Sequence, residues 1–170
     1  MGHHAARHLT MAPFPFRRFT VCRRRPGGTF DLPLTEDQRG AISSLLSELD
    51  DLIGSDPDDP GLRRLRPPAY PDDPEKNAEY QLLAGDELRE ARREAIATVR
   101  SSLDREVLDE AEVWAWLRAI TALRLVVGTN LGIEEDDYDP HIPPGHPDEG
   151  LWAVYDFTSM LQHALVSALS

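Results

Sequence analysis

Apolar residues recur with helical spacing in the segment from residue 35 to residue 54. They occupy positions i, i+3, i+4, i+7, i+10 and i+11, which lie on one face of a helix: Ile42, Leu45, Leu46, Leu49, Leu52 and Ile53. Before this stripe, Thr35 and Gln38 have the spacing of a capping box, in which each side chain binds the backbone N–H of the other residue. Gly54 is a typical helix end. The pattern predicts a helix over residues 35–54.

A second capping box, from Asp109 to Glu112, precedes the most apolar segment of the chain. The apolar residues of 113–131 cover most of a helix circumference, which predicts a helix buried on several sides at the centre of the fold. A further apolar stripe predicts a last helix that begins at about Asp148.

Shorter patterns fill the segment between these helices. Residues 76–84 predict a short helix, and residues 86–104 predict another, with these residues facing inward: Leu88, Ala91, Ala95, Val99 and Leu103. Residues 55–75 contain six prolines and predict an irregular, partly polyproline connection. Three apolar residues of this connection are candidates for contact with the core: Leu62, Leu65 and Tyr70. By its length, the connection is either functional or flexible.

The N-terminal part alternates apolar and polar residues with the period of a strand. Two short runs flank Pro26-Gly27-Gly28 and predict a β-hairpin over residues 14–34. We expect the face formed by Phe19, Val21, Phe30 and Leu32 to rest on the helices. The sequence as a whole predicts a mainly α fold: a multi-helix, bundle-like domain over 14–170, with helices over 35–170 and a disordered tail over 1–13.

Charge is unevenly distributed along the chain, whose formal net charge is −12. Residues 1–30 contain six arginines and no acid, so residues 31–170 hold 12 basic and 30 acidic groups, a net charge of −18. Such a body repels nucleic-acid phosphates and attracts a basic partner surface. We therefore expect a protein partner rather than direct DNA binding, with these candidate contact residues: Arg17, Arg18, Arg23, Arg24 and Arg25.

Location and chemistry are constrained mainly by what the sequence lacks. It contains no apolar run of about 18 residues and no secretory signal, so we expect a cytoplasmic protein without a membrane span. Glycine-rich phosphate loops, the G-x-S-x-G elbow and the H-E-x-x-H motif are absent. His4 and His8 lie in the tail, and the acidic residues 134–139 lack the spacing of a calcium loop. We expect no catalytic residue, metal or cofactor, and the oligomeric state is left open.

Cys22 is the one cysteine, which excludes an internal disulfide and a zinc site built from several thiolates. The strand alternation places it with Arg18, Thr20 and Arg24, opposite the face expected to be buried. Exposure among arginines would favour the thiolate and make Cys22 a redox candidate. The alternative, which we favour, is an inert, half-covered strand cysteine.

Arg124 lies inside the apolar stripe of the predicted central helix. A buried guanidinium without a partner would be very costly, so either its head reaches water or an acid meets it. Asp156 on the last helix is the candidate partner in a structural ion pair.

Three apolar segments and one loop resemble DUF2017, an actinobacterial family catalogued as a domain of unknown function. They are WLRAI at 116–120, RLVVGTNLGI at 124–133, YDFTSMLQ at 155–162 and the loop LRPPAYP at 65–71. The similarity extends from about Phe14 to the C-terminus. These motifs are apolar and structural, so they indicate a relative rather than an activity.

The resemblance implies a small, non-enzymatic regulator. The family includes AosR-type proteins associated with oxidative-stress transcription, which act through a sigma-factor partner and a Cys-x-x-Cys redox pair. Here Cys22 stands alone, with Phe19 three residues before it and Arg25 three after. An internal disulfide switch is therefore excluded. A mixed or intermolecular disulfide and complete loss of redox sensing both stay open.

The leading hypothesis is a cytoplasmic regulatory protein that engages a sigma factor or another component of RNA polymerase. The rival hypothesis is a small enzyme or ligand-binding domain, in which Arg124, Tyr155 and Asp156 line a pocket between helices. A deep pocket around Arg124 would favour the rival, whereas a sealed ion pair at Arg124 would favour the regulator.

Overall fold

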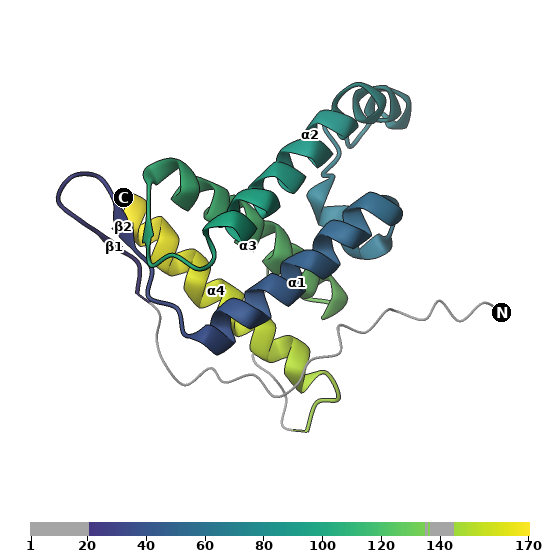
Figure 1. The fold of residues 1–170 in the computed structure, drawn as a ribbon. Helices are drawn as coiled ribbons and strands as arrows, with labels where there is room; N and C mark the ends of the chain where they lie inside the picture. The colour runs from purple at the N-terminus through teal and green to yellow at the C-terminus, as the bar shows by residue number, and fades with distance from the viewer. Residues whose placement is uncertain (1–20, 135, 137–144) are drawn as a thin grey trace.

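The computed structural model describes residues 21–134, 136 and 145–170. The element order is β1 (Arg23–Arg24), β2 (Phe30–Asp31), α1 (Glu36–Ser55), the 3₁₀ helix η1 (Pro60–Leu65), α2 (Pro74–Ser102), β3 (Val107–Leu108), α3 (Glu110–Asn130) and α4 (Glu149–Leu169). Four long helices dominate, and a small sheet lies beside the C-terminal end of α4 (Figure 1). The predicted fold class, mainly α with an N-terminal hairpin, is confirmed. The tail predicted for residues 1–13 lies outside the described residues.

Both predicted capping boxes are present and fix where the first and third long helices begin. The Thr35 hydroxyl accepts from the Gln38 N–H at 3.2 Å, and the Gln38 side chain accepts from the Thr35 N–H at 3.0 Å. Asp109 and Glu112 make the corresponding pair at 2.7 and 2.9 Å. Each box satisfies N–H groups that a helix start leaves without an intrahelical partner.

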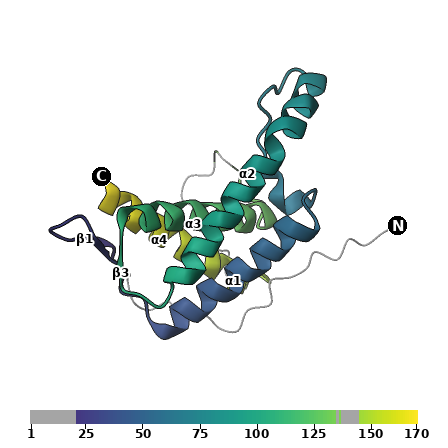
Figure 2. The same ribbon diagram turned by 45° about the horizontal axis from the view of Figure 1, so that its top comes forward.

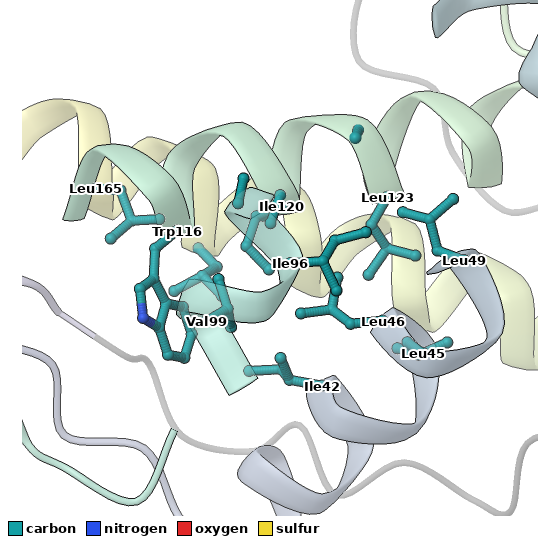
Figure 3. Close-up of a cluster of buried hydrophobic side chains, with 14 of the residues drawn as sticks. Ile42, Leu45, Leu46, Leu49, Ile96, Val99, Trp116, Ile120, Leu123 and Leu165 are labelled. Carbon is teal, nitrogen blue, oxygen red and sulfur yellow. The ribbon is translucent and has the colours of Figure 1, made fainter. Parts of the chain in front are cut away.

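The central helix is α3, as its apolar circumference predicts. It contacts α1, α2, η1 and α4. Its buried side chains meet those of the other helices in one cluster (Figure 3), in which these residues are labelled: Ile42, Leu45, Leu46, Leu49, Ile96, Val99, Trp116, Ile120, Leu123 and Leu165. The indole N–H of Trp116 donates to the hydroxyl of Ser102 at 2.9 Å, so this buried polar group is satisfied.

The two helices predicted over 76–84 and 86–104 are one continuous helix, α2, with Gly85 in its interior. A helical glycine costs about 1 kcal/mol relative to alanine, which weakens a helix without necessarily breaking it. Only the C-terminal half of α2 packs into the core, and the N-terminal half extends away from the other helices (Figure 2). Leu88 and Ala91, expected to face inward, are therefore exposed.

The hairpin is present, and a third strand joins it. β2 pairs with β1 in the register Arg24 opposite Phe30, and with β3 in the register Asp31 opposite Val107. The turn is closed by the Arg25 N–H, which donates to the Thr29 carbonyl at 2.7 Å. Gly27 and Gly28 occupy it with φ of 100° and 86°, a region that disfavours other residues.

The irregular connection between α1 and α2 contains the 3₁₀ helix η1. Leu62 and Leu65 are buried, as expected, while Tyr70 is 47% exposed. No helix in the part of the chain that the structure describes is long and apolar enough to cross a membrane.

Candidate functional site

The hairpin arginines within the described residues are all exposed, but they do not form an isolated positive surface. Arg24 pairs with Glu110 at 3.4 Å, and its guanidinium lies 5.4 Å from the centre of the Phe30 ring. Arg25 pairs with Asp31 at 3.4 Å. The strict separation of charge expected from the sequence is therefore wrong for these two residues. Arg17 and Arg18 lie outside the described residues.

These hairpin pairs are weak enough to be exchanged for other contacts. Each partner side chain keeps between 42% and 55% of its surface exposed. Ion pairs at such exposure contribute roughly 0 to 1 kcal/mol, because water screens them and two flexible side chains must be ordered. A partner carboxylate can thus replace the pairing of Arg24 or Arg25 at little cost in free energy.

Cys22 is buried, with 6% of its surface exposed, and the neighbouring Val21 is 41% exposed. The expectation that Cys22 lies on the exposed face of the strand is therefore wrong. Burial, with a smaller contribution from the charge of Asp31, raises the pKa of the Cys22 thiol from 9.0 to about 11. Both effects disfavour the thiolate, the form that reacts with oxidants.

Arg124 binds two hydroxyl groups of α4. Its Nε donates to Ser159 Oγ at 2.8 Å, and a terminal nitrogen donates to the Tyr155 hydroxyl at 2.8 Å. Within the described residues no ion pair joins Arg124 to Asp156, and the Asp156 side chain is exposed. Arg124 thus binds the neutral hydroxyl oxygens of Tyr155 and Ser159 in place of the predicted Asp156. These two residues lie one and three positions from Asp156 on α4.

The contact between α3 and α4 around Tyr155 is closely packed. The Tyr155 ring meets Trp152 edge to face, with ring centres 6.1 Å apart. A Cβ atom added at Gly128 would lie 3.2 Å from Cε2 of Tyr155 and 3.7 Å from a guanidinium nitrogen of Arg64. Arg124 therefore helps to hold two helices together, which is a structural role.

We predict that Gly128→Val lowers the free energy of unfolding by about 2 kcal/mol, because its methyl groups have no room beside the Tyr155 ring. The matched control is Gly40→Val on α1, where an added Cβ meets nothing within 4 Å. Valine is a better helix former than glycine, so the control should be neutral or slightly stabilising. Thermal unfolding by circular dichroism distinguishes the two, and equal midpoints would contradict the close packing.

A groove that the sequence does not predict lies between the end of α1, η1 and the projecting half of α2. It has a volume of about 450 Å³. Its apolar lining comes from all three elements: Ile53, Leu62, Leu65, Ala78, Leu82 and Gly85. Its positive charge comes from Arg66, Arg89 and Arg92.

The charges of the groove are only partly compensated. Arg66 pairs with Asp58 at 3.0 Å, while its Nε is buried without a hydrogen-bond partner in the described part of the chain. Arg92 donates to the Leu65 carbonyl. Burial and the nearby charge of Arg66 lower the pKa of Arg92. The groove is therefore suited to an apolar side chain accompanied by an acidic one.

The described residues show no metal centre. Among residues 21–134, 136 and 145–170, no three His, Cys, Asp or Glu side chains are grouped so that they could hold a metal ion. His4, His8 and most of the acidic segment 134–139 lie outside these ranges.

Together, these features describe a helical domain built around one apolar helix, with a short arginine-bearing hairpin and an open groove on a projecting helix. The DUF2017 family, a domain of unknown function, matches residues 15–169. The chain belongs to this family, and the resemblance seen in the sequence is confirmed.

Several proteins similar to this chain carry the name AosR. Oxidative stress regulator AosR of Mycobacterium tuberculosis (strain ATCC 25618 / H37Rv) is 32% identical over 192 aligned positions, which cover 90% of this chain and 88% of the relative. The M. bovis protein of that name has the same identity and coverage. An M. leprae relative that bears the name AosR is 35% identical over 150 residues, or 75% of this chain and 69% of its own. No solved structure matches the chain significantly.

Proposed function

We propose that this protein is a non-enzymatic regulator in the response to oxidative stress, and that it acts through a protein partner. The observation that carries the proposal is the similarity to regulators named AosR over 90% of the chain. The hairpin adds a consistent feature, because Arg23, Arg24 and Arg25 are exposed and the ion pairs of Arg24 and Arg25 are weak enough to be exchanged. A surface of this kind suits docking.

The hairpin is the proposed contact site for the partner, through Arg23, Arg24 and Arg25 and, before them, Arg17 and Arg18. Guanidiniums are favoured at interfaces because they bind carboxylates in a bidentate manner. A partner surface with clustered carboxylates is therefore expected, and a sigma factor or another RNA polymerase component is the proposed partner. Duplex DNA is a poorer fit, because residues 31–170 carry a net charge of −18.

A regulator of this type does not need a thiol switch. The chain has one cysteine, and the high pKa of Cys22 keeps that thiol protonated at neutral pH. We propose that redox information reaches this protein through its partner or its abundance. The rival hypothesis of a ligand pocket at Arg124 is not supported, because the hydroxyls of Tyr155 and Ser159 already bind the Arg124 guanidinium.

The test is co-purification of RNA polymerase and its sigma factors with the tagged full chain from native extract, under reducing and oxidising conditions. We expect recovery from the wild type, and at least a roughly 10-fold loss when Arg23, Arg24 and Arg25 are changed to alanine. The matched control removes three exposed arginines elsewhere, Arg63, Arg100 and Arg118, with the same change in net charge. Failure to recover any transcription component, or equal loss in the control, would contradict the proposal.

A further inference from the structure

The projecting half of α2 carries two exposed leucines. Leu82 is 83% exposed and Leu83 is 78% exposed. Leu82 is on the groove side of the helix, while Leu83 points about 100° away from it around the helix axis. Single apolar residues on a surface are ordinary, but an exposed leucine beside an apolar groove, on a helix that extends beyond the core, points to a contact with another molecule. Leu82 also lines the groove, so the apolar surface of the projecting helix continues into the groove beside it.

The groove and the exposed leucines are complementary features of one continuous surface. The groove offers an apolar floor, from Ile53, Leu62 and Leu65, with no side chain filling it. Beside this floor, the helix offers Leu82, most of whose surface is exposed. Two copies related by a twofold axis present the same patch to each other, so each can supply the Leu82 side chain that covers the groove of the other.

The charges of α2 are ordered so that an antiparallel second copy is favoured. Glu79 and Arg89 lie five residues before and after Ala84. Arg93, which lies nine residues after Ala84 as Glu75 lies nine before it, is already paired with Asp50 of its own α1 at 2.9 Å. A twofold axis near Ala84 therefore brings Glu79 of each copy to Arg89 of the other, which favours this orientation of the helices.

One like-charged pair arises in the same register, between Lys76 and Arg92. The two charges are kept apart because Arg92 turns into its own groove and donates to the Leu65 carbonyl. Arg89 is available for a new contact, because its pair with Asp86 at 3.0 Å involves side chains that are 40% and 87% exposed.

Close approach of two helices near Ala84 also requires space. Gly85 provides it, since even an added Cβ would meet only Oε1 of Gln81, at 3.9 Å. A helix with glycine at the crossing point allows another backbone to come near without side-chain interference. Ala78, the other small residue on the groove side, lies two turns earlier.

We propose that this protein forms a homodimer through antiparallel pairing of the projecting halves of α2, with Leu82 of each copy covering the groove of the other and Leu83 at the edge of the contact. The dimer is independent of the partner contact proposed for the hairpin, which lies on the opposite side of the molecule from the projecting half of α2 (Figure 2). It leaves β1 and its arginines exposed for that contact.

The mass in solution tests the proposal directly. Sedimentation equilibrium of the full chain at ~50 μM should give twice the chain mass of 19.1 kDa. Leu82→Glu with Leu83→Glu should raise the dissociation constant at least about 30-fold. Because both leucines are exposed, the circular dichroism spectrum should be unchanged. The matched control is Val166→Glu, which also replaces an apolar residue by an acidic one. Val166 is 45% exposed on α4, so this change should leave the dimer intact.

Charge exchange tests the orientation. Glu79→Arg should weaken the dimer by disfavouring the approach of Arg89, and Glu79→Arg with Arg89→Glu should restore it. Gly85→Cys should crosslink under mild oxidation by diamide, whereas Gly40→Cys, also on a helix with open space around it, should not. Background is low because the single native cysteine, Cys22, is buried.

Two results would overturn the proposal. One is a wild type that sediments as a single chain at all concentrations up to about 1 mM, which would assign the groove to a different molecule. The other is a dimer whose stability is unaffected by the Leu82 and Leu83 substitutions, which would place the interface elsewhere. Either result leaves the hairpin experiment unaffected.

Discussion

Trp116→Ala is expected to lower the free energy of unfolding by about 4 kcal/mol. The Trp116 side chain is 1% exposed at the centre of the core that α1, α2, α3 and α4 share. Its removal leaves a cavity that rigid helices on several sides cannot close. It also leaves the hydroxyl of Ser102, itself fully buried, without the indole donor at 2.9 Å.

The control for this prediction lies two residues earlier on the same helix. Trp114 is 43% exposed, so Trp114→Ala should cost less than about 1 kcal/mol, with the same change in side-chain volume and helix propensity. Urea denaturation followed by far-ultraviolet circular dichroism measures both, without relying on tryptophan fluorescence. Similar losses in the two variants would contradict the position of α3 at the centre of the core.

The contrast between these two tryptophans shows what the sequence could and could not predict. The apolar circumference of residues 113–131 correctly indicates a central helix, because burial on several sides leaves few polar positions. The same pattern cannot distinguish Trp114 from Trp116. Which tryptophan is buried depends on where α2 and α1 pack, and this is a property of the tertiary structure.

Helix starts could be predicted well, because caps are local. The hydrogen bonds of Thr35 with Gln38, and of Asp109 with Glu112, join residues three apart and do not depend on distant parts of the chain. The continuity of α2 could not be predicted. Gly85 is a plausible end for a helix, and no local feature shows that the helix continues outward past the core.

The face of the hairpin was predicted incorrectly because of the length of its turn. Arg24 pairs with Phe30, so five residues form the loop and even-numbered residues lie opposite even-numbered ones. Extended by two residues along each strand, this register places Cys22 opposite Leu32. Both residues then lie on the face of the sheet that carries the buried Phe30. A loop one residue shorter would have placed Val21 there instead, and alternation alone does not determine the loop length.

The groove and the partners of Arg124 could not be predicted for a common reason. Arg66 and Arg92 are 26 residues apart in the sequence, and they approach each other only because η1 lies beside α2. Likewise, Arg124 was expected either to reach water or to meet an acid, with Asp156 as the candidate, whereas two hydroxyls on the facing helix bind its guanidinium. Sequence patterns indicate that a buried cation needs a partner, but the geometry of the helices selects which one.

The burial of Cys22 leads to a second large expected effect, on the reactivity of its thiol. With a pKa of about 11 instead of 9.0, the thiolate fraction at neutral pH is about 100-fold smaller than for an ordinary thiol. Burial of the sulfur slows the reaction further, since a reagent must wait for local opening. We expect the rate of alkylation by iodoacetamide to keep rising with pH up to about 11.

The matched control moves the thiol by one residue, in a Val21→Cys variant that also carries Cys22→Ala. Residue 21 is exposed beside the same arginines, so this thiol should react at least about 100-fold faster at pH 8, with an apparent pKa no higher than the ordinary value. Equal rates in the two proteins would show that Cys22 is accessible and would restore it as a redox candidate.

The same shift in pKa also predicts how stability depends on pH. Because the folded state holds the Cys22 proton more tightly than the unfolded chain, its contribution to the free energy of unfolding is fully present below pH 9 and is lost as the pH rises from 9 toward 11. The decline in this range should be absent from Cys22→Ala. A thiol whose protonated form stabilises the fold at neutral pH contributes to packing, and its oxidation would require the hairpin to leave the core. We therefore expect peroxide to modify Cys22 only slowly.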